Sequence, residues 1–233
     1  MAKRPIFIPV ATKDESWLVY ERGVEFQWHP GLAPSQKKKN VVALHNSARE
    51  KGITPLLEIS TKSDCDLGVR LSAFNLTINI QGFGFVSLES AFQGGKIFKD
   101  GGPYTDLYGL KGSTIKKDKR LTESGGLKGF IFEKHRWSLE PKTAFYDWLY
   151  INAISKFPSM VKELRHFKGF TDIEFNPKKS INCQARSCAL FVSLASRGLV
   201  NKSLVDPVYF INILKKDIYY NPGVSANGQA MLF

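Results

Sequence analysis

Hydrophobic residues recur along the chain in two spacings, which distinguish the predicted strands from the predicted helices. Short runs of β-branched and aromatic residues bounded by Gly, Pro or polar residues are typical of strands. They predict strands at residues 6–11, 24–28, 56–61, 71–80, 83–87, 129–139 and 171–175. Hydrophobic residues every three or four positions predict helices at 35–52, 87–98, 102–110, 113–121, 140–157, 159–167 and 180–198.

Serine and glycine residues mark where several of these helices begin and end. Ser35 and Ser87 are candidate N-caps, and Ser180 is the expected start of the last helix. Gly52 and Gly198 are the expected helix stops. In the segment 87–98 the glycines at its C-terminal side weaken the helix, which we expect to end near residue 98.

Helices supply most of the predicted core. The chain has 233 residues, of which 43% are hydrophobic, and this is enough for a substantial core. No internal repeat or Pro/Gly/Ser-rich linker divides the sequence. We therefore predict a single α+β domain, mainly helical, with a small and mainly antiparallel sheet. Periodicity is weak after residue 206, where Asn, Gly and Pro are frequent.

One predicted helix carries polar side chains among hydrophobic ones. In the stretch FVSLESAFQGGKIF, Glu89, Gln93 and Lys96 are four and three residues apart and share one helical face. One interpretation is an ordinary solvent-exposed face without a function. A Glu in the first turn fits this interpretation, because its negative charge interacts favourably with the helix dipole. The other faces hold Phe, Gly and Ala, which favours a buried helix whose polar stripe faces a cleft.

The net charge favours an anionic partner. Lys and Arg outnumber Asp and Glu by 33 to 21, a net charge of +12, so nucleic acid is the first candidate and a phosphate-bearing small molecule the second. The segment FNPKKSIN places Lys178 and Lys179 before an expected helix start, where an anion can bind. The alternative is that this segment only caps the helix. Two further lysine-rich segments are candidates for phosphate contacts, with a solvated face as the alternative: Lys37, Lys38, Lys39, Lys116, Lys117 and Lys119.

Missing motifs exclude several enzyme classes. The sequence has no GxSxG, HExxH or GxxxxGK[ST] motif, and GFGF at 82–85 lacks the third glycine of a dinucleotide-binding loop. Its four His and three Cys residues have no ligand spacing, so we predict neither a metal site nor a cofactor. No run of apolar residues is long enough to cross a membrane, and the start lacks the apolar region of a signal peptide. We therefore expect a cytoplasmic protein with no membrane partner.

Longer segments resemble a known family. LSAFNL, VSLESAFQGGKIF, KTAFYDWLYINAI and TDIEFNPKKSINCQARSCALFVSL resemble the NADAR family, specifically the NADAR antitoxins that accompany DarT-type toxins. The wider family has an LSNF-like segment before a Glu-x-x-x-Gln-x-x-Lys helix. The matching residues here are Leu71, Ser72, Phe74, Glu89, Gln93 and Lys96. Ala73 stands where the family has Asn, and Asn75 is the expected substitute. Asp172 and Asn182 fit the C-terminal motif, but its Trp-Gly pair is absent.

The resemblance implies a domain extent and an activity. It runs from the first strand to about residue 205, so we expect a YbiA-like NADAR domain at 1–205. Residues 206–233 would form a C-terminal extension that packs on it or trails from it. The implied activity is removal of ADP-ribose from guanine in DNA, which reverses the modification made by a DarT-type ADP-ribosyltransferase. ADP-ribosylated DNA, ADP-ribose and a cognate DarT-type toxin are then the expected partners.

Two alternatives stay open. One is an N-glycosidase that acts on a phosphorylated ribosylamine metabolite. The other is a protein without catalytic activity that binds nucleic acid or the toxin.

Under the enzymatic interpretation Glu89 and Lys96 are the expected catalytic residues. Glu89 is expected to stabilise an oxocarbenium-like ribose or to activate water. Lys96 is expected to hold a ribose hydroxyl or phosphate; the alternative is attack on the opened sugar as a Schiff-base nucleophile. Trp148 is a candidate for stacking on a base, with a core position as the alternative. The residues expected to contact the ligand are Ser72, Asn75, Gln93, Trp148, Asp172, Lys179 and Asn182.

Overall fold

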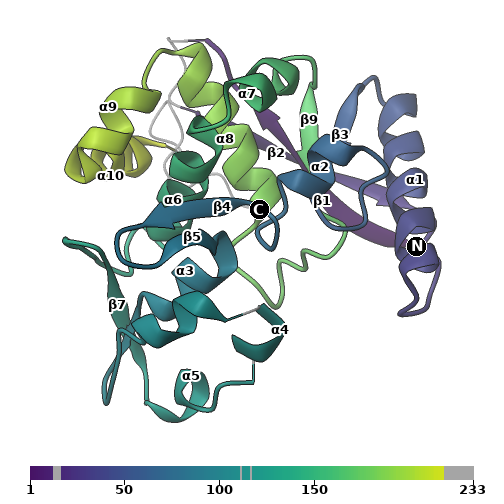
Figure 1. The fold of residues 1–233 in the computed structure, drawn as a ribbon. Coiled ribbons are helices and arrows are strands. Elements are labelled where there is room, and N and C mark those ends of the chain that lie inside the picture. The colour runs from purple at the N-terminus through teal and green to yellow at the C-terminus, as the bar shows by residue number, and fades with distance from the viewer. Residues whose placement is uncertain (13–16, 111, 116, 218–233) are drawn as a thin grey trace, which may run out of the picture.

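A long antiparallel hairpin opens the fold and supplies two strands of a four-stranded sheet. In the computed structural model, which describes residues 1–12, 17–110, 112–115 and 117–217, β1 (Ala2–Pro9) and β2 (Val19–Phe26) form this hairpin. Its neighbours come from elsewhere in the chain: β9 (Gly169–Thr171) pairs antiparallel with β1 and parallel with β3 (Leu56–Glu58). The strand order is β2-β1-β9-β3 (Figure 1).

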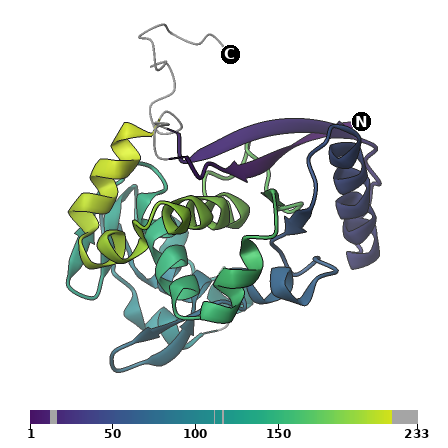
Figure 2. The same ribbon diagram turned by 90° about the horizontal axis from the view of Figure 1, so that it is seen from above.

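Helix α1 (Pro34–Glu50) packs against this sheet and closes a small core. Val41, Leu44 and Ala48 form its buried side and meet side chains of β1 and β2. Figure 2 shows α1 beneath the N-terminal end of the hairpin. Gly52, with a φ of 74°, follows the last turn as predicted. Ser35 does not cap the helix; the N-cap residue is Ala33, and no side chain accepts a hydrogen bond there.

The larger core forms around α6 (Ala144–Ser155) and α8 (Gln184–Ser196), which pack against each other. Helix α6 is hydrophobic on every side and buried on nearly all of them, as expected for the central helix of a core. Helices α7 (Pro158–Leu164) and α9 (Val200–Val205) contact α6.

A helix that the sequence pattern did not predict follows residue 206. In α10 (Pro207–Lys216), Asp206 caps the first turn by accepting a hydrogen bond from the backbone N–H of Tyr209 at 2.9 Å. Phe210 and Leu214, one turn apart, are fully buried in the larger core. The division into a domain ending at 205 and an extension after it stays a prediction.

The segment of Glu89 and Lys96 is a helix followed by a strand. The N-cap prediction is confirmed, because Ser87 Oγ accepts a hydrogen bond from the N–H of Ser90 at 3.1 Å. The expected end near residue 98 is wrong: α3 (Leu88–Gly94) is followed by β6 (Lys96–Phe98), which pairs with β7 (Leu127–Phe132). Two successive glycines end the helix and the pairing with β7 extends the next residues. Lys96 therefore does not share a helical face with Glu89.

Two small antiparallel sheets and several short helices complete the fold. The hairpin of β4 (Thr77–Ile80) and β5 (Gly84–Ser87) leads into α3, and residues 71–76 of the predicted strand form a turn instead. The second sheet has the order β6-β7-β8, where β8 is His135–Trp137. The short helices are α2 (Asp66–Arg70), the 3-10 helix η1 (Thr105–Gly109), α4 (Gly112–Ile115) and α5 (Arg120–Glu123).

The segment between β9 and α8 also differs from prediction. The strand expected at 171–175 ends at Thr171, and a turn follows it. The helix expected from Ser180 begins only at Gln184, because residues 176–183 are held in turns. In these turns Asn176 Oδ1 accepts from the N–H of Lys178 at 3.1 Å, and Ser180 Oγ donates to the carbonyl of Asn182 at 3.2 Å.

Within residues 1–12, 17–110, 112–115 and 117–217, no helix combines the length and the apolar character needed to cross a membrane.

Candidate active site

A pocket of about 360 Å3 lies between α3, α6 and the segment that joins β9 to α8. This volume is within the ~300–1,000 Å3 range of small-molecule sites. The pocket brings together four of the predicted site residues, Glu89, Gln93, Asp172 and Asn182. Its other lining residues are Ala73, Phe74, Phe92, Tyr146, Glu174, Phe175, Ser180 and Gln184.

Glu89 lies in the first turn of α3, where a neighbouring amide orients its carboxylate. Gln93, one turn later, donates from Nε2 to Glu89 Oε1 at 3.1 Å. The backbone N–H of Glu89 donates to the carbonyl of Ala73 at 3.1 Å, which attaches the start of α3 to the turn after α2. The half-buried carboxylate is therefore held at the pocket wall by its own helix.

Lys96, on strand β6, does not line the pocket but lies beside it. Its Nζ lies 5.1 Å from the centroid of the Phe92 ring, which lines the pocket. Partial burial lowers the pKa of Lys96, while the negative charge of nearby Glu89 acts in the opposite direction. An amine of lowered pKa beside a carboxylate can act as a hydrogen-bond donor or, when deprotonated, as a nucleophile.

Asp172 forms the opposite wall, at the end of β9. The side chain is 8% exposed. Its Oδ1 accepts a hydrogen bond from the N–H of Glu174 at 3.0 Å, and Gln184 also hydrogen-bonds to it. Burial, and then the negative charge of Glu58, raises the pKa of Asp172 to about 8.

The pocket also contains residues that the sequence interpretation missed. Tyr146 of α6 lines the pocket, and the pKa of its hydroxyl group is raised well above the ordinary value, first by burial. Gln184 Oε1 accepts a hydrogen bond from the backbone N–H of Ala73 at 2.8 Å and connects the start of α8 to the turn after α2. Tyr146 lies in a segment that resembles the family, but that resemblance assigned Tyr146 no role. Gln184 was visible in the sequence only as an amide in hydrophobic surroundings, for which a cap or a buried hydrogen-bonded amide was the expected explanation.

Asn182 offers an acceptor to a ligand. Its Oδ1 is buried and, within the part of the chain that the structure describes, has no hydrogen-bond partner. Since Asn182 lines the pocket, a donor group of a bound molecule can satisfy this oxygen.

Four of the predicted ligand-contacting residues do not line the pocket: Ser72, Asn75, Trp148 and Lys179. Ser72 is fully buried. Asn75 is exposed and donates from Nδ2 to the carbonyl of Val69 at 2.9 Å, so it does not substitute for an Asn at position 73 in the pocket. Trp148 is buried and packs against Trp137 in the aromatic core. It therefore has the core position that was the alternative to stacking on a base, and its ring is not accessible to a ligand.

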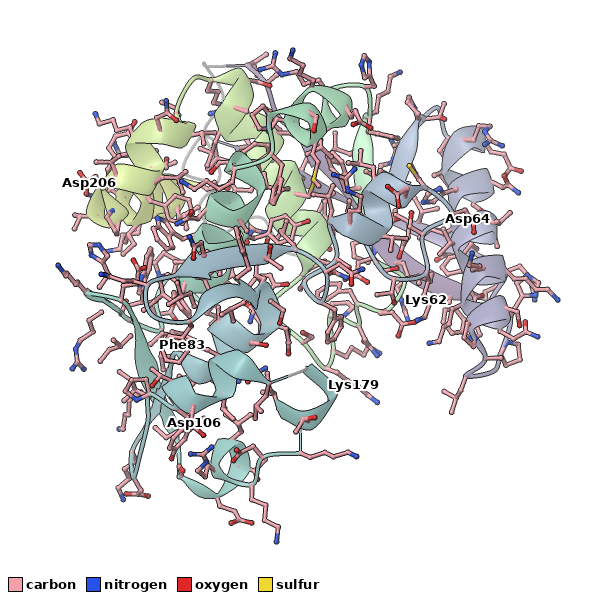
Figure 3. The ribbon with its side chains drawn as sticks, in the orientation of Figure 1. Lys62, Asp64, Phe83, Asp106, Lys179 and Asp206 are labelled. Atoms are coloured by element: carbon pink, nitrogen blue, oxygen red, sulfur yellow. The ribbon has the colours of Figure 1, made fainter. Side chains whose placement is uncertain are left out.

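The predicted anion-binding lysines differ in their exposure and in whether they form ion pairs within the protein. Lys179 is exposed on the loop before α8, and its side chain extends away from that loop (Figure 3). Lys117 and Lys119 are exposed next to α4, a helix that contacts α3, and Lys39 is exposed on α1. Lys37 lies 3.6 Å from Glu174, and Lys38 lies 2.8 Å from Asp64, so both take part in ion pairs. Lys116 lies outside the described residues.

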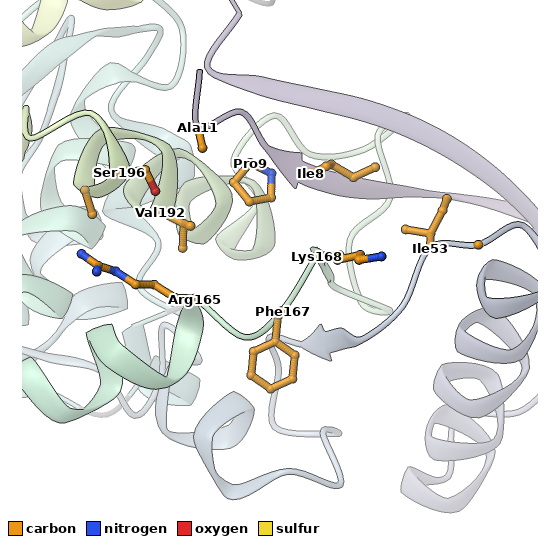
Figure 4. A pocket seen from close by; sticks show the side chains of 11 residues that line it. Ile8, Pro9, Ala11, Ile53, Arg165, Phe167, Lys168, Val192 and Ser196 are labelled. Atoms are coloured by element: carbon orange, nitrogen blue, oxygen red, sulfur yellow. The ribbon is translucent and has the colours of Figure 1, made fainter. Parts of the chain in front are cut away.

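A second, larger cavity has a different chemical character. It measures about 660 Å3 and lies between the end of β1, α8 and the residues that follow α7 (Figure 4). Its lining is mainly apolar, with Arg165 and Lys168 as its charged groups among the described residues. Since this lining brings no carboxylate, we place the candidate active site in the smaller pocket.

Comparison with known proteins agrees with the resemblance noted in the sequence. The sequence model of the DarT1-associated NADAR antitoxins matches residues 2–230, which include every residue of the pocket. No curated protein matches the chain. NADAR proteins belong to an N-glycosidase superfamily, a class of hydrolases. Because the match extends over nearly the whole sequence, the chain belongs to the family of DarT1-associated NADAR antitoxins.

Proposed function

We propose that this protein hydrolyses the N-glycosidic bond between ADP-ribose and the amino group of guanine in DNA, and so acts as the antitoxin of a DarT-type ADP-ribosyltransferase. One observation carries the proposal: Glu89 and its orienting amide Gln93 line one pocket, and the amine of Lys96 lies beside that pocket, close to Phe92 and Glu89. Family membership supports the antitoxin role and the hydrolase class.

The bond to be broken joins the anomeric carbon of ribose to a nitrogen. As it breaks, positive charge develops on the sugar ring, and a water oxygen must attach to the anomeric carbon. The Glu89 carboxylate serves both needs, since it stabilises the positive ring and accepts a proton from the attacking water. The hydrogen bond from Gln93 keeps the carboxylate in the orientation that this task requires.

Lys96 assists from the neighbouring strand. Its amine acts as a donor to a ribose hydroxyl or a phosphate oxygen of the ligand. A Schiff base with the opened sugar is the alternative role of the same amine, and the lowered pKa of Lys96 is compatible with it. Reduction by borohydride during turnover separates the two roles, because only a Schiff base gives a stable adduct on Lys96.

The positive charge of the molecule supports a nucleic-acid substrate. The net charge is +12, and exposed lysines lie on the loop before α8, which supplies pocket residues, and beside α4, which contacts α3. Lys178, Lys179, Lys117 and Lys119 are the residues we propose for contacts with the DNA backbone.

The test is to incubate the purified protein with a guanine-ADP-ribosylated oligonucleotide and to measure unmodified DNA and free ADP-ribose. Glu89→Gln should lower turnover by about 10²–10⁴-fold with little change in binding, because the variant keeps shape but cannot take a proton. Lys96→Ala should also lower turnover. Glu50→Gln, an exposed residue of α1, is the matched control and should turn over like wild type.

The competing functions give different results in the same assay. A ribosylamine N-glycosidase would leave the oligonucleotide intact but cleave small phosphorylated aminosugars. A binding protein would release no ADP-ribose, and the protection it gives against the toxin would not depend on Glu89.

A further inference from the structure

A buried carboxylate lies directly behind the wall of the pocket. Glu58, the last residue of β3, is 2% exposed and accepts three hydrogen bonds. Ser60 Oγ donates to its Oε1 at 2.7 Å, and the backbone N–H of Ile173 donates to the same oxygen at 2.8 Å. Thr171 Oγ donates to Oε2 at 2.6 Å. Three donors on one carboxylate favour its ionised form and oppose the effect of burial, which raises the pKa of Glu58.

Two of these donors belong to the residues on either side of Asp172. Successive side chains of an extended segment point to opposite sides. Since Thr171 points toward Glu58, Asp172 points away from it, and it lines the pocket. Glu58 therefore fixes both neighbours of Asp172 from behind.

A histidine of α1 extends this support. The single hydroxyl proton of Thr171 is donated to Glu58, so the 2.9 Å contact between Thr171 Oγ and His45 Nε2 requires His45 to be the donor. Burial lowers the pKa of His45 to about 4, so the ring is neutral near pH 7 and carries its proton on Nε2. The hydrogen bonds from His45 to Thr171 and from Thr171 to Glu58 therefore fix the orientation of the Thr171 side chain at the end of β9.

The groups around Asp172 favour its protonated form. Glu58 is a like charge on the other side of the same strand end, and burial together with this charge holds the pKa of Asp172 near 8. Glu174 also raises the pKa of Asp172, although its ion pair with Lys37 reduces its effect. Glu89 is a further carboxyl group that faces Asp172 across the pocket. Three more titratable groups near Asp172 are neutral at this pH, because burial raises their pKa values well above the ordinary ones: Tyr146, Tyr150 and Cys183.

We propose that Asp172 is the acid that protonates the departing guanine nitrogen, and that Glu58 is the positioning residue that holds Asp172 to this task. This inference rests on the proposed function and adds the acid that the reaction needs. An amino nitrogen bonded to ribose departs poorly unless it gains a proton as the bond breaks.

The step balances with two carboxyl groups and one water molecule. The bond between the anomeric carbon and the guanine nitrogen breaks, and its electron pair stays on the nitrogen, which takes the proton of Asp172. The water oxygen bonds to the anomeric carbon, and Glu89 takes the proton that this water releases. The products are free ADP-ribose and unmodified guanine, and proton exchange with solvent restores both carboxyl groups.

The deciding experiment varies the leaving group. Wild type, Asp172→Asn and Glu89→Gln are assayed on a guanine-ADP-ribosylated oligonucleotide and on ADP-ribose joined through its anomeric carbon to 4-nitrophenol, which departs without protonation. Asp172→Asn should lower kcat on the oligonucleotide by about 10²–10⁴-fold but on the nitrophenyl compound by less than about tenfold. Glu89→Gln should lower kcat on both. Equal losses for Asp172→Asn on the two substrates would overturn the role of Asp172.

The pH profile on the oligonucleotide is a second readout, which does not depend on the nitrophenyl compound. An acid must be protonated to act, so wild-type kcat/KM should fall as the pH rises above about 8. Absence of this fall would contradict the proposal. A wild-type protein that leaves the oligonucleotide modified at every pH would instead refute the proposed function itself.

Glu58→Gln tests the positioning role. Removing the charge of Glu58 should lower the pKa of Asp172, so the fall in kcat/KM should move to lower pH, while Glu50→Gln should leave it in place. An unshifted profile in Glu58→Gln would refute the role of Glu58. Thermal unfolding of each variant is measured in parallel, and if Glu58→Gln does not fold, Thr171→Val replaces it. That variant removes the hydroxyl between Glu58 and His45, and it too should move the fall in kcat/KM.

Discussion

At the scale of single residues, Asp147 connects the two central helices of the core. It lies on α6 and pairs with Arg186 of α8 at 2.9 Å, with both side chains at most 2% exposed. Thr143 Oγ and Ser187 Oγ each donate to the same carboxylate at 2.6 Å. In the sequence, Asp147 is a polar residue among hydrophobic ones, and the sequence alone does not indicate its role. The structure gives it a role in packing α6 against α8, outside the pocket.

Arg186→Met should destabilise the protein by about 3–5 kcal/mol, because it leaves the charge of Asp147 buried without its cation. Urea denaturation measures this change in the free energy of unfolding. The double variant Arg186→Met/Asp147→Leu is the control, and it should lose less stability than Arg186→Met, since neither charge remains. A loss below about 1 kcal/mol in the single variant would contradict the account of the pair.

The pKa of Asp172 also predicts how stability depends on pH. The folded value of about 8 lies above the ordinary value of 3.8, so the folded state binds the proton more tightly. This stabilising contribution is complete below about pH 4 and is lost as the pH rises to about 8. His45, with a folded pKa of about 4 against an ordinary 6.5, acts in the opposite sense, but only below about pH 6.5.

Chemical denaturation between pH 6.5 and 8.5 isolates the contribution of Asp172. Wild type should lose stability over this range, and Asp172→Asn should lose less, because the amide does not titrate. Parallel curves for the two proteins would show that the carboxyl group titrates with the same pKa in the folded and unfolded chain.

At the scale of elements, the corner between α3 and β6 sets the relation between Glu89 and Lys96. A Cβ atom on Gly94 would lie 2.5 Å from a ring carbon of buried Tyr108, so the end of α3 fits closely against η1. The lack of a side chain at this position lets the helix end next to the strand that carries Lys96.

Gly94→Ala should cost about 1–3 kcal/mol of stability, because the added methyl group must displace Tyr108 or the end of α3. Turnover should fall as well, since the displacement changes how Glu89 and Lys96 face the ligand. Thermal unfolding and the oligonucleotide assay measure the two effects. Gly109→Ala is the matched control, because nothing lies within 4 Å of the Cβ that it adds, and it should change neither quantity appreciably.

The same corner shows how far local sequence patterns predict this fold. The start of α3 was predictable, because the cap is made by Ser87, a residue of the segment itself. Its end was not, because Lys96 and Ile97 are extended by pairing with Phe130 and Gly129, more than thirty residues later. Helical spacing therefore predicted correctly that Glu89 and Gln93 lie on one face of α3. It was wrong for Lys96, which lies beyond the end of the helix.

The candidate site was predictable to a similar extent. Family motifs identified Glu89, Gln93, Asp172 and Asn182, which the fold brings to one pocket. Glu58 could not be identified from the sequence, because its contacts are with β9 and the residues after it, more than a hundred residues later in the chain. Helix α10 was missed for another reason: its buried Phe210 and Leu214 precede a tail rich in Asn and Gly, which obscured a short periodic segment.

At the scale of the whole molecule, the positive charge should act mainly through the lysines beside the pocket. The net charge of +12 favours encounter with any polyanion, but Lys37 and Lys38 are paired with carboxylates of the protein. Lys178 and Lys179 are exposed on a loop that also supplies pocket residues. These two lysines are therefore better placed for contacts with the substrate backbone than those of α1.

The double variant Lys178→Gln/Lys179→Gln should weaken processing of modified DNA and make it less dependent on salt. Loss of two phosphate contacts should reduce the slope of log kcat/KM against log salt by up to about 1.8. Lys215→Gln/Lys216→Gln on α10 removes the same charge at the end of a helix that contacts α6 and α9, and should leave the slope nearly unchanged. Equal effects of the two pairs would mean that only total charge matters.

The central position of β9 has a consequence for synthesis of the protein. This strand lies between β1 and β3, so a nascent chain that ends before residue 169 leaves the backbone edges of both without their neighbour. Contacts between residues so distant in sequence form late and slow the overall rate of folding. The wall that carries Asp172 is therefore completed only after most of the polypeptide has left the ribosome, and protection against the toxin should lag behind the onset of translation.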